Sequence, residues 1–284
     1  MCGGEILKTD TSAANLRDYL WRLKGIGNKD TAYVLAESAQ QLYRDSGYSD
    51  LITFEEDIAR IASVVLVISE SAGSLAELGA FCSNSVISPV LRVLISESNF
   101  AQESFIRWGP VERILTANRE RVGVFPWAAD GKPGVLEASA DPFFQDIEKF
   151  IDDHIGAASS TMQYPVDTEI AQFYDIMWII YLADAITPLK LLELLQRIHS
   201  DVTLYSLRRK VYTLRVARWL KIAPYGSQDF YYLPEQNDPF RYGFIDGSKD
   251  KEPIRRVLSV RNELFSETPK GAIARVRSLR ETQA

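Results

Sequence analysis

The chain has 284 residues, enough for one large domain or two smaller ones. Hydrophobic residues make up 46% of it and charged residues 25%, as in soluble globular proteins. No apolar run is long enough to span a membrane and no secretory signal begins the chain, so we expect a cytoplasmic protein without a membrane partner. Two cysteines and two histidines are too few for a disulfide framework, a histidine-based triad or a metal cluster. The net charge of −6 argues against nucleic-acid binding by the whole surface.

The first predicted elements are short. Cys2-Gly3-Gly4 is a run of small residues, typical of the end of a strand. Leucine and tyrosine spacing predicts an amphipathic helix over 16–23 that ends near Gly25. A short strand is expected over 32–35, followed by a helix that starts at Glu37. Glu37 is either a weak second candidate for a site or a solvated acid on this helix.

The next helix is expected to begin at Thr53. Thr53 would be its N-cap, with Glu56 three residues later as in a capping box. We interpret Glu55 and Glu56 as capping residues and not as catalytic ones. The apolar residues of this helix, Ile58 and Ile61, are expected to face a sheet.

The central stretch, Val64 to Phe81, carries the strongest pattern. Residues 64–68 form an unbroken aliphatic run, which predicts a strand buried on both faces of a parallel sheet. A turn over 69–74 follows, with Gly73 free to adopt angles that other residues avoid, and then a helix from Ser74. Backbone N–H groups and the positive dipole end at such a turn suit a phosphate. Glu77 in the first turn would either face a ligand at the carboxyl end of the strand or act as capping partner of Ser74.

Two further strands and a closing helix complete this domain. The strands are expected over 90–95 and 122–126, and the helix over 143–151. Between the strands, a polar loop leads into Phe105 to Pro110. Phe105 and Trp108 either line a pocket for a base or nicotinamide by stacking, or pack in the core at a turn. Arg107 either holds a phosphate or points to solvent.

The chain changes character after a small, uncharged stretch, 156–163, which we interpret as a linker. An apolar helix is expected over 170–183 and a second over 189–198, with Thr187 as N-cap and Pro188 at N1. A basic helix over 204–220, a strand, a turn and a strand follow. This order is that of a winged helix-turn-helix domain.

The basic helix suggests contact with nucleic acid. Arg208, Arg209 and Lys210 would lie at phosphates, and Arg215 is on the same helix. The alternative is a protein-docking module, because such folds often bind proteins. The segment 248–284, with scattered arginines and acids, is expected to be a partly ordered arm.

The stretch Ser71 to Phe81, Ser-Ala-Gly-Ser-Leu-Ala-Glu-Leu-Gly-Ala-Phe, resembles the catalytic signature of the nucleoside deoxyribosyltransferase-like superfamily. With the blocks Cys2-Gly3-Gly4 and 105–111, in the same order, it resembles the toxin effectors of bacterial retron antiphage systems more narrowly. The chain departs from that pattern in one respect: Met1 directly precedes Cys2, where relatives have a buried first strand. An unpaired position beside the nucleotide loop would then be expected in the sheet.

The resemblance implies an α/β fold with an N-terminal Rossmann-like parallel sheet and a C-terminal winged helix-turn-helix domain. The domains would cover 1–155 and 164–247, with the linker 156–163 between them and the arm 248–284 at the end. Glu77 would be the catalytic nucleophile that attacks the anomeric carbon of a ribose. Substrate would be held by Gly3, Gly4, Glu37, Ser69, Gly73, Ser74, Arg107 and Trp108.

The expected function is that of a toxic effector in retron antiphage defence, acting by abortive infection. It would hydrolyse the N-glycosidic bond of NAD, or of a related nucleotide, with NAD as substrate and no cofactor. The resemblance implies a complex with the retron reverse transcriptase and its msDNA, and a homo-oligomer or higher-order assembly. The alternative is a non-catalytic nucleotide-sensing regulator that binds DNA.

Overall fold

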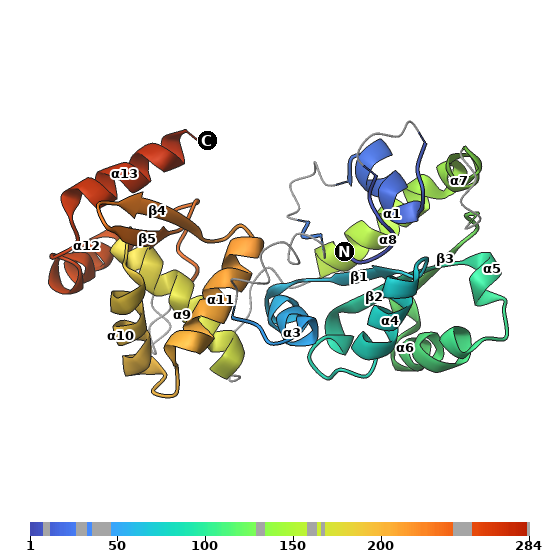
Figure 1. Cartoon of the computed structure of the whole chain (residues 1–284), viewed down its shortest axis with the longest axis horizontal. Helices are drawn as coiled ribbons and strands as arrows, with labels where there is room; N and C mark the ends of the chain where they lie inside the picture. The colour runs from blue at the N-terminus through green and yellow to red at the C-terminus, as the bar shows by residue number, and fades with distance from the viewer. Residues whose placement is uncertain are drawn as a thin grey trace. The chain divides into compact units, whose positions relative to one another are not determined.

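The computed structural model describes residues 1–7, 12–26, 33–35, 47–128, 134–157, 164–165, 168–240 and 252–282. The chain forms two compact units (Figure 1). The first comprises Met1–Leu42 and Asp50–Met162, and the second comprises Tyr43–Ser49 and Gln163–Ala284. No helix among the described residues combines the length and apolarity needed to cross a bilayer.

The first unit is built on a three-stranded parallel sheet in the order β1-β2-β3. Its strands are β1 (Val65–Ile68), β2 (Leu91–Ser96) and β3 (Val122–Phe125), close to the ranges predicted from their apolar runs. The helices are α1 (Leu16–Asp18), α3 (Leu51–Ile61), α4 (Ala72–Phe81), α5 (Glu97–Phe100), α6 (Glu112–Ala117), α7 (Val135–Ala140) and α8 (Phe144–Ala157). Two π-helical turns, Tyr19–Leu23 and Arg107–Val111, extend α1 and precede α6.

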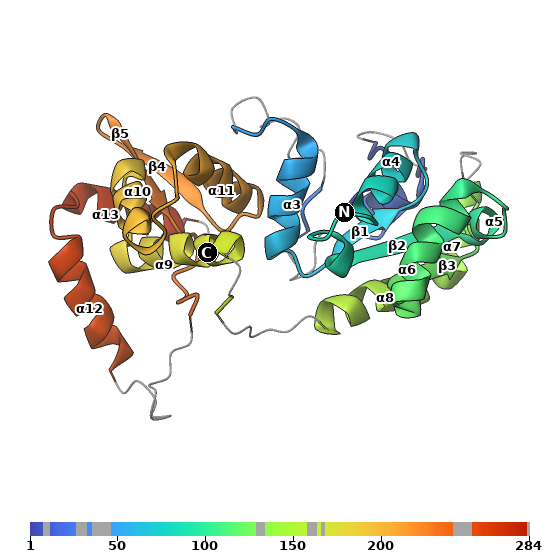
Figure 2. The ribbon, with the colours of Figure 1, turned by 90° about the horizontal axis from the view of Figure 1, so that it is seen from below.

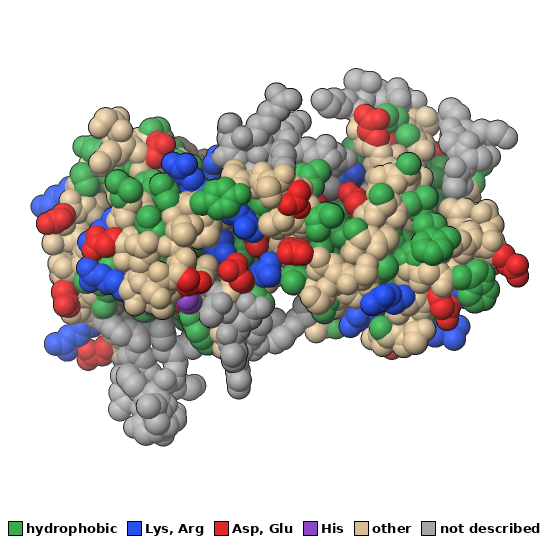
Figure 3. All heavy atoms as spheres, turned by 60° about the horizontal axis from the view of Figure 1, so that its bottom comes forward, with side chains coloured by type: hydrophobic (Ala, Val, Ile, Leu, Met, Phe, Trp, Pro, Cys, Tyr) green, Lys and Arg blue, Asp and Glu red, His purple; other side chains and the backbone are tan. Residues whose placement is uncertain are grey.

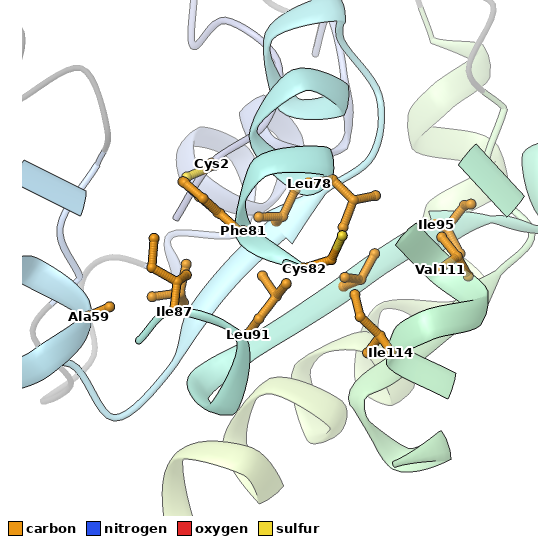
Figure 4. Close-up of a cluster of buried hydrophobic side chains, with 13 residues drawn as sticks. Cys2, Ala59, Leu78, Phe81, Cys82, Ile87, Leu91, Ile95, Val111 and Ile114 are labelled. Atoms are coloured by element: carbon orange, nitrogen blue, oxygen red, sulfur yellow. The ribbon is translucent and has the colours of Figure 1, made fainter. Parts of the chain in front are cut away.

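Both faces of this sheet are covered, as the unbroken apolar strands predict. Alternate residues of β1 enter different cores: Val65 and Val67 pack under α4 and α6, whereas Leu66 and Ile68 pack under α1 and α8. Figure 1 shows these helix pairs on opposite sides of the sheet. Figure 4 shows the core on the α4 side, which also contains both cysteines.

The edge of the sheet beside β1 is occupied by Cys2. Its N–H donates to the carbonyl oxygen of Leu66 at 2.8 Å, and its carbonyl oxygen accepts from Ile68 N–H at 3.0 Å. Cys2 thereby forms a parallel bridge to Val67. The position expected to be unpaired is therefore filled by one residue. The strand expected over 32–35 is not formed in the described residues 33–35.

Two predicted helix starts were wrong. The N-cap of α3 is Asp50 and not Thr53, because Asp50 Oδ1 accepts the Thr53 N–H at 2.8 Å. The helix α4 begins at Ala72, two residues before the predicted start at Ser74, and Ser71 is its N-cap. Gly73 lies within α4 and its φ is not positive, so this turn does not use the conformational freedom of glycine.

The second unit contains α9 (Thr168–Ala183), α10 (Pro188–Ile198) and α11 (Leu204–Val216) before a hairpin, β4 (Lys221–Tyr225) and β5 (Gln228–Tyr232). Thr187 caps α10 with Pro188 at N1, as predicted. Ile186, between α9 and α10, pairs with Tyr231 of β5. Gly226 makes the hairpin turn at φ +62°. Figure 2 shows the helices of this unit gathered about the hairpin.

The segment 248–284, expected to be a partly ordered arm, is largely helical where the structure describes it. It folds as α12 (Pro253–Leu264) and α13 (Lys270–Glu281) and is part of the second unit. Ala272 and Val276 of α13 are buried against Ala223 and Phe230 of the hairpin. Asp184 is fully buried and has φ +70°. Its carboxylate pairs with Arg261 of α12 and with Arg277 and Arg280 of α13. These arginines are therefore counter-ions of a buried acid.

Candidate active site and basic helix

The site is built around Glu77, which lies in the second turn of α4 and not in the first. The capping box of this helix is formed by Ser71 and Ser74: each side chain accepts the backbone N–H of the other, at 3.1 and 3.0 Å. Capping is therefore complete without Glu77. The alternative prediction, that Glu77 is the capping partner of Ser74, was wrong.

A second carboxylate, Glu55 of α3, lies close to Glu77. Burial, with a smaller contribution from the Glu77 carboxylate, raises the pKa of Glu55 to about 7, against the lowering effect of the Met1 ammonium group. The same two carboxylates raise the pKa of the Cys2 thiol, which burial already raises strongly. The helix α4, which carries Glu77, follows β1 in the chain and so begins near the carboxyl end of that strand, where open α/β sheets bind ligands. The acidic pair Glu55–Glu77 is the candidate active site.

Glu55 was predicted to be a capping residue and not a site residue, because it stands two residues after Thr53, the predicted N-cap. Asp50 followed by Thr53 was a signal that could have corrected it, because an acid three residues before a threonine also fits an N-cap. With the N-cap at Asp50, Glu55 falls beyond the first turn and needs another explanation. Its neighbour Glu56 does have a structural partner, since its Oε1 accepts from Asn84 Nδ2 at 2.6 Å.

Gly3 and Gly4 lie beside this edge and pack tightly against other parts of the chain. A Cβ on Gly4 would be 2.5 Å from Asn15 Cγ, and one on Gly3 would be 2.8 Å from Arg17 Cδ. The Gly4 N–H donates to Glu70 Oε1 at 3.0 Å, and the Gly3 carbonyl oxygen accepts from a serine hydroxyl. The N–H group of Gly4, a predicted substrate-binding residue, is therefore bound to a carboxylate in this structure.

That carboxylate, Glu70, lies two residues after the end of β1 and binds two other segments of the chain. Besides Gly4, its oxygens accept the N–H groups of Leu16 at 2.7 Å and Arg17 at 3.1 Å, the first residues of α1. Its pKa is raised by burial, although these three N–H groups act to lower it. Glu70 therefore fixes the Gly3-Gly4 loop and the start of α1 relative to β1.

The remaining predicted substrate residues lie in different settings. Ser69 is buried at the end of β1, and its hydroxyl has no hydrogen-bond partner among the described residues. Arg107 pairs with Glu112, and its guanidinium lies over the rings of Phe100 at 4.2 Å and Trp108 at 4.5 Å. Trp108 is 58% exposed and Gly73 is exposed. Glu37 lies outside the described residues.

The basic residues of α11 differ in exposure. Arg208 and Arg215 are exposed and share one face, seven residues apart. Lys210 is 2% exposed; its Nζ pairs with Glu169 Oε2 at 2.6 Å and lies over the ring of Phe173. Arg209 is half-buried, and its guanidinium lies over the ring of Tyr48 at 4.8 Å. Only part of the predicted basic cluster is therefore open to a phosphate backbone.

Charges of both signs alternate on the described part of the surface seen in Figure 3, in keeping with the net charge of −6. A basic patch for nucleic acid would therefore be local. The described residues contain no group of three His, Cys, Asp or Glu that could hold a metal ion.

Comparison with known proteins identifies relatives. A stretch of 123 residues, which is 43% of this chain, is 28% identical to a retron Ec86 protein of Escherichia coli. The name of that protein describes it, provisionally, as a ribosyltransferase and DNA-binding protein. The match covers 38% of the relative's length. The profile of the STM3845 retron effector protein family matches residues 13–222, about three quarters of the chain. The chain therefore belongs to the STM3845 retron effector protein family.

Proposed function

We propose that this retron effector is an N-glycosidase that cleaves NAD, or a related nucleotide, with Glu77 as nucleophile. The observation that carries the proposal is the acidic pair Glu55–Glu77 at the carboxyl edge of the sheet, in which neither carboxylate is needed for a helix cap. The ribosyltransferase term in the relative's name agrees with chemistry at C1′ of a ribose. Family membership supports a role in retron antiphage defence.

The two carboxylates suit different steps. Glu77 attacks C1′, and a C1′–O bond forms as the C1′–N bond breaks through an oxocarbenium-like transition state. The base leaves with the bonding electrons; nicotinamide leaves oxidised NAD as a neutral molecule and needs no proton. Water then attacks C1′, Glu77 departs, and the Glu55 carboxylate takes the proton of that water. A pKa of about 7 is well placed for this transfer, because it leaves Glu55 partly ionised at neutral pH.

The second unit would be a winged helix-turn-helix domain, with α10 and α11 as the helix pair and β4–β5 as the wing. The order of its elements, together with the bridge from Ile186 to the hairpin, supports this assignment. Arg208 and Arg215 would contact phosphates of the msDNA in a complex with the reverse transcriptase. We expect this complex to restrain or activate the glycosidase, and the effector to assemble with further copies of itself.

The test is incubation of the purified full-length protein with NAD, with chromatography of released nicotinamide. Reactions are run with the protein alone and with co-expressed reverse transcriptase and msDNA. Glu77→Gln should abolish release and leave the melting temperature within a few degrees of the wild type. Glu56→Gln, next to Glu55 in the chain, is the matched control and should retain activity. Full activity of Glu77→Gln would rule out the mechanism. Absence of nicotinamide release in every state would overturn NAD as the substrate.

A further inference from the structure

The peptide group between Gly3 and Gly4 is held at both ends by two consecutive residues that come shortly after β1. Its carbonyl oxygen accepts the hydroxyl of Ser71 at 3.2 Å, and its N–H donates to Glu70 Oε1 at 3.0 Å. The next carbonyl oxygen, that of Gly4, accepts from the buried guanidinium of Arg17 at 3.1 Å. A rotation of this peptide group would break hydrogen bonds at both of its ends. Its orientation is therefore fixed.

Glu70 ties this peptide group to a second segment of the chain. Its carboxylate also accepts the N–H groups of Leu16 and Arg17, so three backbone N–H groups from two segments converge on one side chain. Hydrogen bonds from N–H groups to an ionised carboxylate are stronger than those between neutral groups. A side chain one methylene shorter would fall about 1.5 Å short of at least one segment. The contacts therefore depend on the length of Glu70 as well as on its charge.

Cys2 connects this peptide group to the core beside the acidic pair. Its side chain is 2% exposed and belongs to the same buried cluster as Ala59 of α3 and Leu78 of α4 (Figure 4). Ala59 lies one turn after Glu55 on the same side of α3, and Leu78 follows Glu77 directly. Burial, and after it the carboxylates of Glu55 and Glu77, raise the pKa of the Cys2 thiol. The Cys2 side chain therefore lies near both acids.

We propose that Glu70 is a positioning residue for the acidic pair. Glu70 fixes the Gly3–Gly4 peptide group, and this group holds Cys2 in its place at the edge of the sheet. Cys2 in turn fills the core against which the helices of Glu55 and Glu77 pack. Without the Glu70 contacts, segment 2–4 shifts and water reaches Glu55. The inference rests on the proposed function of the acidic pair and adds the residue that keeps Glu55 buried.

The folded-state pKa of Glu55 is the readout, because a change that only destabilises the fold leaves that pKa where it is. Urea unfolding of the full chain is measured from pH 4.5 to pH 8 for the wild type and for Glu55→Gln. The difference between the two proteins isolates the titration of Glu55. Because burial raises the pKa of Glu55 to about 7, this difference should keep changing up to about pH 7.

The same pair of proteins is then measured with Glu70→Asp, which keeps the charge and loses the reach. The difference should now stop changing at about pH 6 or below, because a Glu55 in contact with water binds its proton about tenfold more weakly. The ionisable groups that face Glu55 stay the same in these proteins: the Glu77 carboxylate on α4, the Met1 ammonium group and the Cys2 thiol. Glu70→Gln keeps the reach but has a single acceptor oxygen, and it is the second variant, with a shift in the same direction expected.

Glu137→Gln is the matched control in the same unit. The Glu137 carboxylate also accepts a backbone N–H, that of Ala13, but it belongs to α7 and does not contact segment 2–4 through this bond. This variant should lower the free energy of unfolding and leave the titration of Glu55 unchanged. An unchanged Glu55 titration in Glu70→Asp would overturn the proposal, and so would an equal shift in Glu137→Gln. Neither result depends on hydrolysis of NAD, so a failure of the glycosidase assay and a failure of the positioning role can be told apart.

Discussion

Glu55→Gln should remove a pH dependence from the stability of the protein. Burial and the nearby Glu77 raise the pKa of Glu55 from its ordinary 4.5 to about 7. Because the folded-state pKa is the higher one, the stabilisation from the bound proton is fully present below about pH 4.5 and is lost as the pH rises through 7. A shift of this size corresponds to at most about 3 kcal/mol, and less to the extent that solvent reaches the side chain.

The measurement is urea-induced unfolding at pH 5 and pH 8 at constant ionic strength. The free energy of unfolding of the wild type should fall between these values relative to that of Glu55→Gln, which should be the more stable protein at pH 8. Glu77→Gln should reduce the same difference, because it removes the negative charge that helps to raise the Glu55 pKa. Glu56→Gln serves as the control and should follow the wild type. An equal stability gap between wild type and Glu55→Gln at both pH values would refute a buried acid with a raised pKa.

Three other predictions concern packing and charge. Gly4→Ala should destabilise the first unit by about 1–3 kcal/mol in urea unfolding, because its Cβ would overlap the asparagine described above, whereas Gly79→Ala has nothing within 4 Å and should be neutral or stabilising. Asp184→Asn keeps a residue that tolerates positive φ but removes the charge, so it should lower the melting temperature through the loss of three arginine contacts; an unchanged value would mean that the arginines are adequately solvated without it. In titrations with duplex DNA, Arg208→Gln should reduce the salt slope of binding by about one. Lys210→Met, which alters a buried ion pair, should leave that slope unchanged; the opposite ranking would contradict the exposure of the two side chains.

Strands and most helices of this chain could be predicted from local pattern. The apolar run before Ser69 specified a strand buried on both faces, and Thr187-Pro188 specified the start of α10. Helix starts were less secure where several capping residues stood close together. Asp50 and Thr53 compete for one cap, as do Ser71 and Ser74, and each wrong choice shifted an acid, Glu55 or Glu77, by a turn.

What could not be predicted depends on contacts between distant parts of the chain. Glu55 and Glu77 are on different helices, and no local pattern indicates that their carboxylates interact. Lys210 has the same charge as Arg208, but its position on α11 turns it towards Glu169, so exposure and not composition decides its role. Tyr48 precedes α3 in sequence yet packs in the second unit, which a linear division into domains cannot represent.

The counter-ions of Asp184 bear on how shortened forms of this protein should be designed. The family profile ends at residue 222, but the arginines that neutralise this buried acid come from α12 and α13, well after that point. A protein cut at the profile boundary would also lose β5 and would leave a negative charge in a nonpolar interior. Such a fragment should aggregate or unfold whatever its catalytic competence, so inactivity of a trimmed protein would say nothing about the acidic pair.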